Sequence, residues 1–143
     1  MKKILKKQNK SRKLILQGMY SWEFTKNNTE EIENQIIKNQ NKNKIDLIYI
    51  KKLLNHIPKK SKILNYILKY NIEKNTTINI IEIIIIKIAL FEIFFLQTMT
   101  PKITINESLE LSKKFCSKNS HMLINKILNN IIKGYIYNNN LLN

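Results

Sequence analysis

Glycine, proline and cysteine are scarce in this sequence of 143 residues, which contains two glycines, two prolines and one cysteine. A single cysteine, Cys116, cannot form a disulfide within the chain, which is typical of a reducing cytoplasm. Two glycines cannot build a phosphate-cradling loop, and no GxGxxG, GxxxxGK[ST], CxxC or HExxH motif occurs. Cys116 could in principle form a nucleophile–base pair with His121. The favoured interpretation is that Cys116 is a free thiol near a helix end. We therefore expect neither enzyme activity nor a bound metal or cofactor.

Arginine is equally scarce, because Arg12 is the only one among 25 basic residues. These outnumber 10 acidic residues and give a net charge of +15, which favours a polyanionic partner such as nucleic acid or an acidic membrane surface. Lysine, asparagine and isoleucine share A/U-rich codons, so an A/T-biased genome could by itself raise the lysine count. The position of the charge is therefore more informative than its total.

The N-terminal segment concentrates positive charge before the first acidic residue, Glu23. Residues 1–10 are expected to form a flexible basic arm that follows phosphates, because neutralising them releases bound counterions. Tyr20 follows Lys13 by one to two helical turns, where its ring could stack on an unpaired base. The alternative is a solvated tail with a half-buried Tyr20, and composition does not separate single-stranded RNA from DNA.

Apolar residues recur at helical spacing along most of the chain, which predicts about seven helices and no strand. The predicted helices cover residues 14–22, 30–37, 46–57, 61–68, 78–98, 104–115 and 120–134. Pro58 is expected to end the third helix, Ser61 to cap the fourth and Gly134 to end the last. Residues 136–143 are expected to form a frayed tail. The predicted class is a single all-α domain.

The most apolar segment, residues 78–99, is long enough to cross a bilayer. It contains Glu82, Lys87 and Glu92, and each charge costs about 2.5–3.5 kcal/mol near a bilayer centre. We therefore expect a central buried helix within a compact bundle. The N-terminus lacks the unbroken apolar stretch of a signal peptide, so a cytoplasmic location is expected.

Three ordered segments resemble the NusB family of bacterial transcription antitermination factors. The first is SRKLILQGMYSWEFT at residues 11–25, and the second is IALFEI at residues 88–93. The third is PKITINESLELSKKF at residues 101–115, which is followed by NSH at 119–121 and INKIL at 124–128. The resemblance covers essentially the whole chain, although residues 29–77 match mainly by apolar spacing.

The resemblance implies two packed three-helix units and binding to boxA, a sequence of nascent ribosomal RNA. It also implies a partner, the small-subunit ribosomal protein NusE, within an antitermination complex of RNA polymerase. By position, the RNA-binding residues would be Lys6, Lys7, Lys10, Arg12, Lys13, Gln17, Tyr20, Lys118, Asn119 and Ser120. Glu82 would face NusE, and the free protein would be a monomer or a homodimer.

Two departures from the family pattern have physical consequences. Lysine replaces most arginines in the arm. This keeps the positive charge but loses the planar guanidinium, which can form two parallel hydrogen bonds with a phosphate. Cys116 replaces a usual glycine, and if its backbone needs a positive φ the replacement costs about 1 kcal/mol. In that case a Cys116→Gly variant would be the more stable protein.

Alternative functions stay open at this point. A NusB-like domain also occurs fused to an RNA methyltransferase, but the sequence contains no cofactor domain, which favours the isolated form. The chain could instead be a non-specific basic RNA-binding protein, or a membrane-surface protein with a basic amphipathic face. In both of these cases its charge would mainly reflect A/T codon bias.

Overall fold

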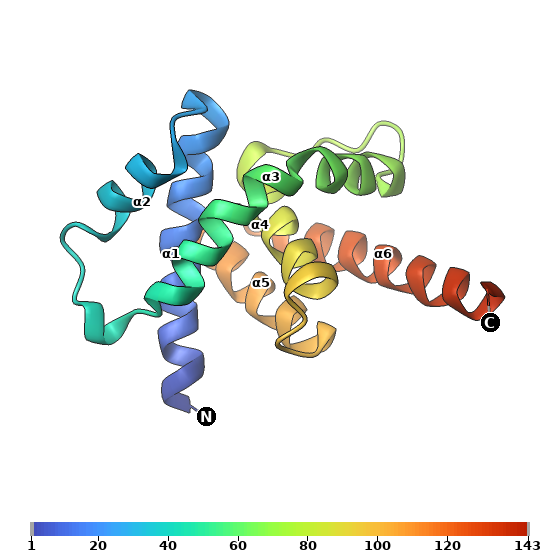
Figure 1. The fold of residues 1–143 in the computed structure, drawn as a ribbon. Coiled ribbons are helices and arrows are strands. Elements are labelled where there is room, and N and C mark those ends of the chain that lie inside the picture. The colour runs from blue at the N-terminus through green and yellow to red at the C-terminus, as the bar shows by residue number, and fades with distance from the viewer. Residues whose placement is uncertain (1, 143) are drawn as a thin grey trace. The chain divides into compact units, whose positions relative to one another are not determined.

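The computed structural model of the chain describes the backbone of residues 2–142 and the side chains of residues 6–136. Within the described backbone every regular element is helical, which confirms the all-α prediction (Figure 1). The elements are α1 (Lys2–Thr25), α2 (Thr29–Ile37), the 3₁₀-helix η1 (Lys42–Lys44), α3 (Leu47–Asn71), α4 (Ile80–Phe91), the π-helix η2 (Glu92–Leu96), α5 (Pro101–Phe115) and α6 (Ser120–Leu142). The chain divides into two compact units, residues 1–61 and residues 62–143.

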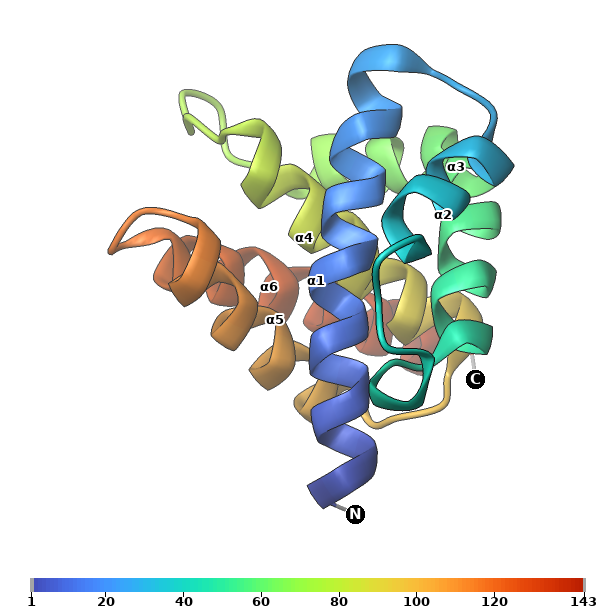
Figure 2. The same ribbon diagram turned by 90° about the vertical axis from the view of Figure 1, so that its left-hand side faces the viewer.

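The first unit contains α1, α2 and the N-terminal part of α3. Figure 2 shows α2 beside α1, and Gly18 of α1 lies where both α2 and α3 come close to it. A Cβ atom at Gly18 would lie 2.6 Å from Cδ2 of Leu54 in α3 and 3.4 Å from Cγ2 of Ile32 in α2. Ser11 adds a polar link, because its hydroxyl accepts the backbone N–H of Asp46 at 2.8 Å. Three helices therefore meet around one glycine.

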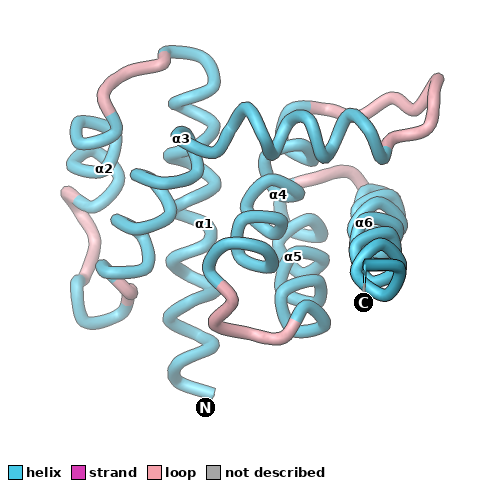
Figure 3. The backbone as a smooth tube through the Cα atoms, turned by 45° about the vertical axis from the view of Figure 1, so that its right-hand side comes forward, coloured by secondary structure: helices cyan, strands magenta, loops and turns pink. Residues whose placement is uncertain are grey.

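The second unit contains the C-terminal part of α3, with α4, η2, α5 and α6 (Figure 3). Helix α4 packs against both α5 and α6, and residues 84–91 are all buried. The prediction of a buried central helix is confirmed for this unit. No helix in the described part of the chain is long and apolar enough to cross a membrane.

The predicted break at Pro58 is wrong, because α3 continues from Leu47 to Asn71 with Pro58 inside it. A proline inside a helix costs about 3 kcal/mol, because it removes one hydrogen bond and crowds the preceding turn. Ile57 and Leu64 are both fully buried on either side of it. Burying each such side chain contributes about 1.5–3 kcal/mol, which offsets the cost. Ser61 is consequently a buried helical residue and not a cap.

The predicted helix ends also need correction. Helix α1 begins at Lys2, so residues 2–10 are helical and do not form a flexible arm. Helix α6 continues through Gly134 to Leu142, because Gly134 does not adopt the positive φ of a glycine stop. Of the expected frayed tail, the side chains of residues 137–143 lie outside the described residues. Helix α5 begins at Pro101, where Thr100 caps it by accepting the N–H of Ile103 at 3.4 Å.

Candidate nucleic-acid interface

Five of the predicted RNA-binding residues share one face of α1. They succeed one another at intervals of three or four residues, so at about 100° per residue they span only about 80° of the helix surface. We call this face the α1 stripe, and it consists of Lys6, Lys10, Lys13, Gln17 and Tyr20. Lys13 is half-buried and the other members are exposed. Lys7 is also exposed and borders the stripe.

Helix α1 carries positive charge along most of its length before any acidic residue occurs. The first acidic residue of the helix is Glu23, five turns after Lys6, and its carboxylate pairs with Lys26 at 3.1 Å. The ammonium group of Lys26 also lies 3.8 Å from the centroid of the Trp22 ring. The N-terminal part of the stripe is therefore cationic, and its C-terminal end is aromatic.

Phe24 extends the stripe by one further turn and was missed by the sequence analysis. Its side chain is 66% exposed, and that of Tyr20 is 42% exposed. The two ring centroids lie 4.8 Å apart with planes tilted by 54°. The four-residue spacing from Tyr20 could have revealed this neighbour, because such residues lie one above the other on a helix. Two open rings can each offer a face to an unpaired base.

Arg12 does not belong to this exposed face, which corrects the sequence-based expectation. It is only 1% exposed, its guanidinium donates to Oδ1 of Asn9 at 3.3 Å, and its Cζ lies 5.8 Å from the centroid of the Tyr49 ring. Ile15 and Met19 follow it at helical spacing and are buried too. Arg12 therefore stabilises the interior of the protein and is not presented to a ligand.

The turn between α5 and α6, in the second unit, brings together the other three predicted residues. Lys118 and Asn119 are exposed. Ser120 is only 2% exposed, and its hydroxyl is hydrogen-bonded to that of Ser117 at 3.0 Å. The turn can thus present one ammonium and one amide, while Ser120 holds the start of α6.

Glu82, expected to face a partner, is buried at the start of α4. Its Oε1 accepts the backbone N–H of Asn79 at 2.9 Å, and its own N–H donates to Oδ1 of Asn79 at 2.9 Å. These reciprocal bonds form a capping box, which satisfies donors that a helix start leaves unpaired. With 6% exposure, Glu82 positions α4 and does not display its charge.

Cys116 lies at the C-terminus of α5, close to this carboxylate. Burial and the Glu82 charge raise the pKa of the Cys116 thiol, while a hydrogen bond with Ser120 acts in the opposite direction. The backbone of Cys116 is extended, with φ of −117°, so its position does not require glycine. The expectation that Cys116→Gly would stabilise the protein therefore fails, since glycine only adds freedom to the unfolded chain.

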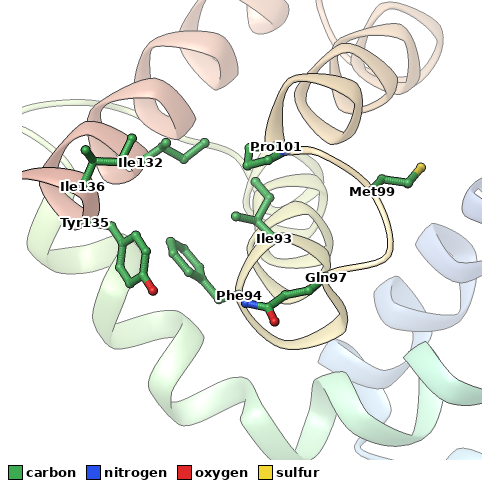
Figure 4. A pocket seen from close by; sticks show the side chains of 8 residues that line it. All are labelled: Ile93, Phe94, Gln97, Met99, Pro101, Ile132, Tyr135 and Ile136. Atoms are coloured by element: carbon green, nitrogen blue, oxygen red, sulfur yellow. The ribbon is translucent and has the colours of Figure 1, made fainter. Parts of the chain in front are cut away.

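A pocket of about 290 Å³ opens in the second unit between η2, the following loop and α6 (Figure 4). Ile93, Ile132 and Ile136 line it together with Phe94 and Tyr135, whose rings meet edge to face at 5.1 Å. None of its lining residues carries a carboxylate, an imidazole or a thiol. Gln97 and Tyr135 are the only polar side chains among its lining residues, so the pocket is mainly apolar.

Together these features define a small helical protein whose first helix presents a cationic face that ends in open aromatic rings. A model of the NusB family matches residues 9–133. The chain is 36% identical to the transcription antitermination protein NusB of Buchnera aphidicola subsp. Baizongia pistaciae over 129 residues, 90% of each chain. It is 29% identical to that of Shewanella frigidimarina, covering 87% of this chain and 93% of the relative.

The fold agrees with these sequence matches. The structure of T. maritima NusB superposes with a TM-score of 0.77 over 87% of this chain and 89% of that one, at 19% identity. The chain belongs to the NusB family.

Proposed function

We propose that this protein is an RNA-binding transcription antitermination factor that binds boxA of nascent ribosomal RNA together with NusE, and so helps RNA polymerase to read through terminators. Membership of the NusB family supports antitermination, because the curated relatives are named for it. The choice of boxA and NusE rests on the family resemblance. The structural observation that best supports RNA binding is the α1 stripe, where lysine side chains and the exposed Tyr20 ring share one helix face.

The two ends of the α1 stripe contribute differently to RNA binding. Lys6 and Lys10 neutralise phosphates, and each phosphate neutralised on a single strand contributes about 0.7 to the slope of log affinity against log salt. Lysine acts as a point charge without the bidentate geometry of arginine, so these contacts add little sequence discrimination. Discrimination then depends on the Gln17 amide, which can bond base edges, and on the Tyr20 ring, which can stack.

NusE remains the proposed protein partner, with a changed role for Glu82. Since its carboxylate caps α4 and is almost fully buried, we propose that it acts by holding the start of this helix. The residues of α4 that NusE would contact directly are then the half-buried neighbours of the cap, Ile80, Ile81 and Ile83.

The test is a fluorescence-anisotropy titration of a boxA-like RNA against a scrambled RNA of equal length, with and without NusE, at two salt concentrations. We expect tighter binding to boxA, with a preference that increases when NusE is present. A Lys6→Gln/Lys10→Gln double variant should lower the salt slope by about 1.4, at about 0.7 per phosphate. The matched control, Lys38→Gln/Lys42→Gln, removes two exposed lysines of the same unit outside α1.

Two results would contradict the proposal. Equal, steeply salt-dependent binding to both RNAs, with or without NusE, would leave a non-specific basic RNA-binding protein. Binding to vesicles containing anionic lipid, with no affinity for either RNA, would instead indicate a membrane-surface protein.

A further inference from the structure

A second exposed aromatic pair lies on the C-terminal part of α3, in the second unit. Tyr66 and Tyr70 are 68% and 79% exposed. Their ring centroids are 6.2 Å apart and their planes are inclined by only 21°, so the rings are nearly parallel. Both rings thus present open faces to solvent from successive turns of one helix.

Positive charge surrounds this pair. Helix α3 contains six lysines and neither aspartate nor glutamate. Lys62 precedes Tyr66 by four residues and Lys69 follows it by three, so both lie near the rings on the helix surface. Both side chains are exposed. The nearest acidic residue in sequence, Glu73, lies beyond the helix end and pairs with Lys126 at 3.5 Å.

The fold of the second unit does not depend on these rings. Leu64 and Leu68, on the other side of the helix, are buried and pack this part of α3 against the core. An exposed ring pair adds at most about 0.5–1.5 kcal/mol. Two large, open aromatic side chains among lysines are therefore available for a ligand.

We propose that this face of α3 binds single-stranded RNA and forms a surface additional to the α1 stripe. We call it the α3 platform, and it consists of Lys62, Tyr66, Lys69 and Tyr70. The tyrosine rings stack on bases and the lysines neutralise the adjoining phosphates, which is the combination that sequence-tolerant single-strand binding uses. A protein-docking face would instead be depleted of lysine. The platform requires neither boxA nor NusE, so it does not depend on the function proposed above.

The first measurement is a titration of the full-length protein with a twelve-nucleotide oligouridylate, which carries no boxA sequence. Stacking is worth about 1–3 kcal/mol per base, so removing both rings in Tyr66→Ala/Tyr70→Ala should weaken binding about thirty-fold or more. Tyr66→Phe/Tyr70→Phe keeps both π-faces and should restore affinity close to that of the unmodified protein. Ile48→Ala is the matched control, because Ile48 is 80% exposed on the same helix but lies outside the platform.

Two further measurements separate RNA from other ligands. Lys62→Gln/Lys69→Gln should lower the salt slope by about 1.4, at about 0.7 per phosphate. A 4-thiouridine-substituted oligouridylate should crosslink to a peptide containing residues 66–70. The proposal is overturned if the alanine double variant folds normally and binds oligouridylate as before, or if crosslinks fall only on α1. Oligouridylate binding that depends on Tyr66 and Tyr70, without any preference for boxA, would refute the proposed function and leave this inference standing.

Discussion

Tyr20 and Phe24 lie on successive turns of α1, with ring centroids 4.8 Å apart and planes tilted by 54°. Each ring limits the movement of the other, so a base that stacks on Tyr20 meets a ring that is already held in place. Fixing a side chain before binding lowers the entropy lost on association. The pair therefore has two separable roles, with Tyr20 as the stacking surface and Phe24 as its support.

Alanine substitution should separate these roles. We expect Tyr20→Ala to weaken binding of a boxA-like RNA about ten-fold, because one stacked base is worth about 1–3 kcal/mol. Phe24→Ala should cost less, about two- to three-fold, because it removes only the support. Tyr20→Phe should bind nearly as well as the unmodified protein. Unchanged affinity of a folded Tyr20→Ala variant, checked by circular dichroism, would exclude Tyr20 from the site.

The two glycines should respond oppositely to alanine. Gly18→Ala should destabilise the protein by about 1–3 kcal/mol, because the new Cβ overlaps the buried Leu54 side chain and overpacks the core. Gly134→Ala should stabilise it by about 0.5–1 kcal/mol, because no atom outside the local helix lies within 4 Å and alanine favours the helix. Urea denaturation of both variants measures the difference. A more stable Gly18→Ala protein would mean that α1 and α3 can separate without cost.

Substitutions of Glu82 should distinguish its role in capping α4 from a direct effect of its charge on NusE binding. Glu82→Gln keeps an oxygen that can accept the N–H of Asn79, so its melting temperature should stay close to that of the unmodified protein. Glu82→Lys removes the acceptor and places a cation at a positive helix end, which should cost about 1–2 kcal/mol. We expect NusE pull-down to survive Glu82→Gln and to weaken with Glu82→Lys. Loss of NusE binding in a stable Glu82→Gln protein would show that the charge itself faces the partner.

Hydrophobic periodicity was sufficient to predict the helical class and the buried helix α4, because apolar side chains recur with the period of a helix. The sequence could not reveal that α3 passes through Pro58. Local propensity disfavours a proline there, and the burial of side chains on either side, Ile57 and Leu64 among them, offsets this cost. Gly134 was misjudged for a related reason, since a glycine ends a helix only where the chain turns, and here it does not.

The candidate site was predicted in part. Lys6, Lys10 and Gln17, which the family resemblance assigned to the RNA-binding surface, lie together on one exposed face of α1. Arg12 was assigned to the same surface by its position in the family pattern and its charge, although on the helix it shares the face of the buried Ile15 and Met19. Charge is a poor guide to exposure when hydrogen bonds and a nearby ring can accommodate a guanidinium in the interior.

The pH dependence of Cys116 alkylation should report on the environment of Glu82. Iodoacetamide reacts with the thiolate, so a raised pKa moves the midpoint of the rate-against-pH curve above that of an unperturbed cysteine. Glu82→Gln removes a repelling negative charge and should lower this midpoint. Ser120→Ala removes a hydrogen bond that favours the thiolate and should raise it.

Glu110→Gln is the matched control for this measurement, because Glu110 is an exposed carboxylate of α5 that pairs with Lys113 at 3.2 Å. It should leave the midpoint unchanged, since solvent screens a charge at the surface far more than one beside a half-buried thiol. If Glu82→Gln and Glu110→Gln shift the midpoint equally, the effect comes from the net charge of the protein and not from the Glu82 carboxylate. If neither shifts it, burial alone controls the thiol, and Glu82 serves the α4 cap without an electrostatic effect on Cys116.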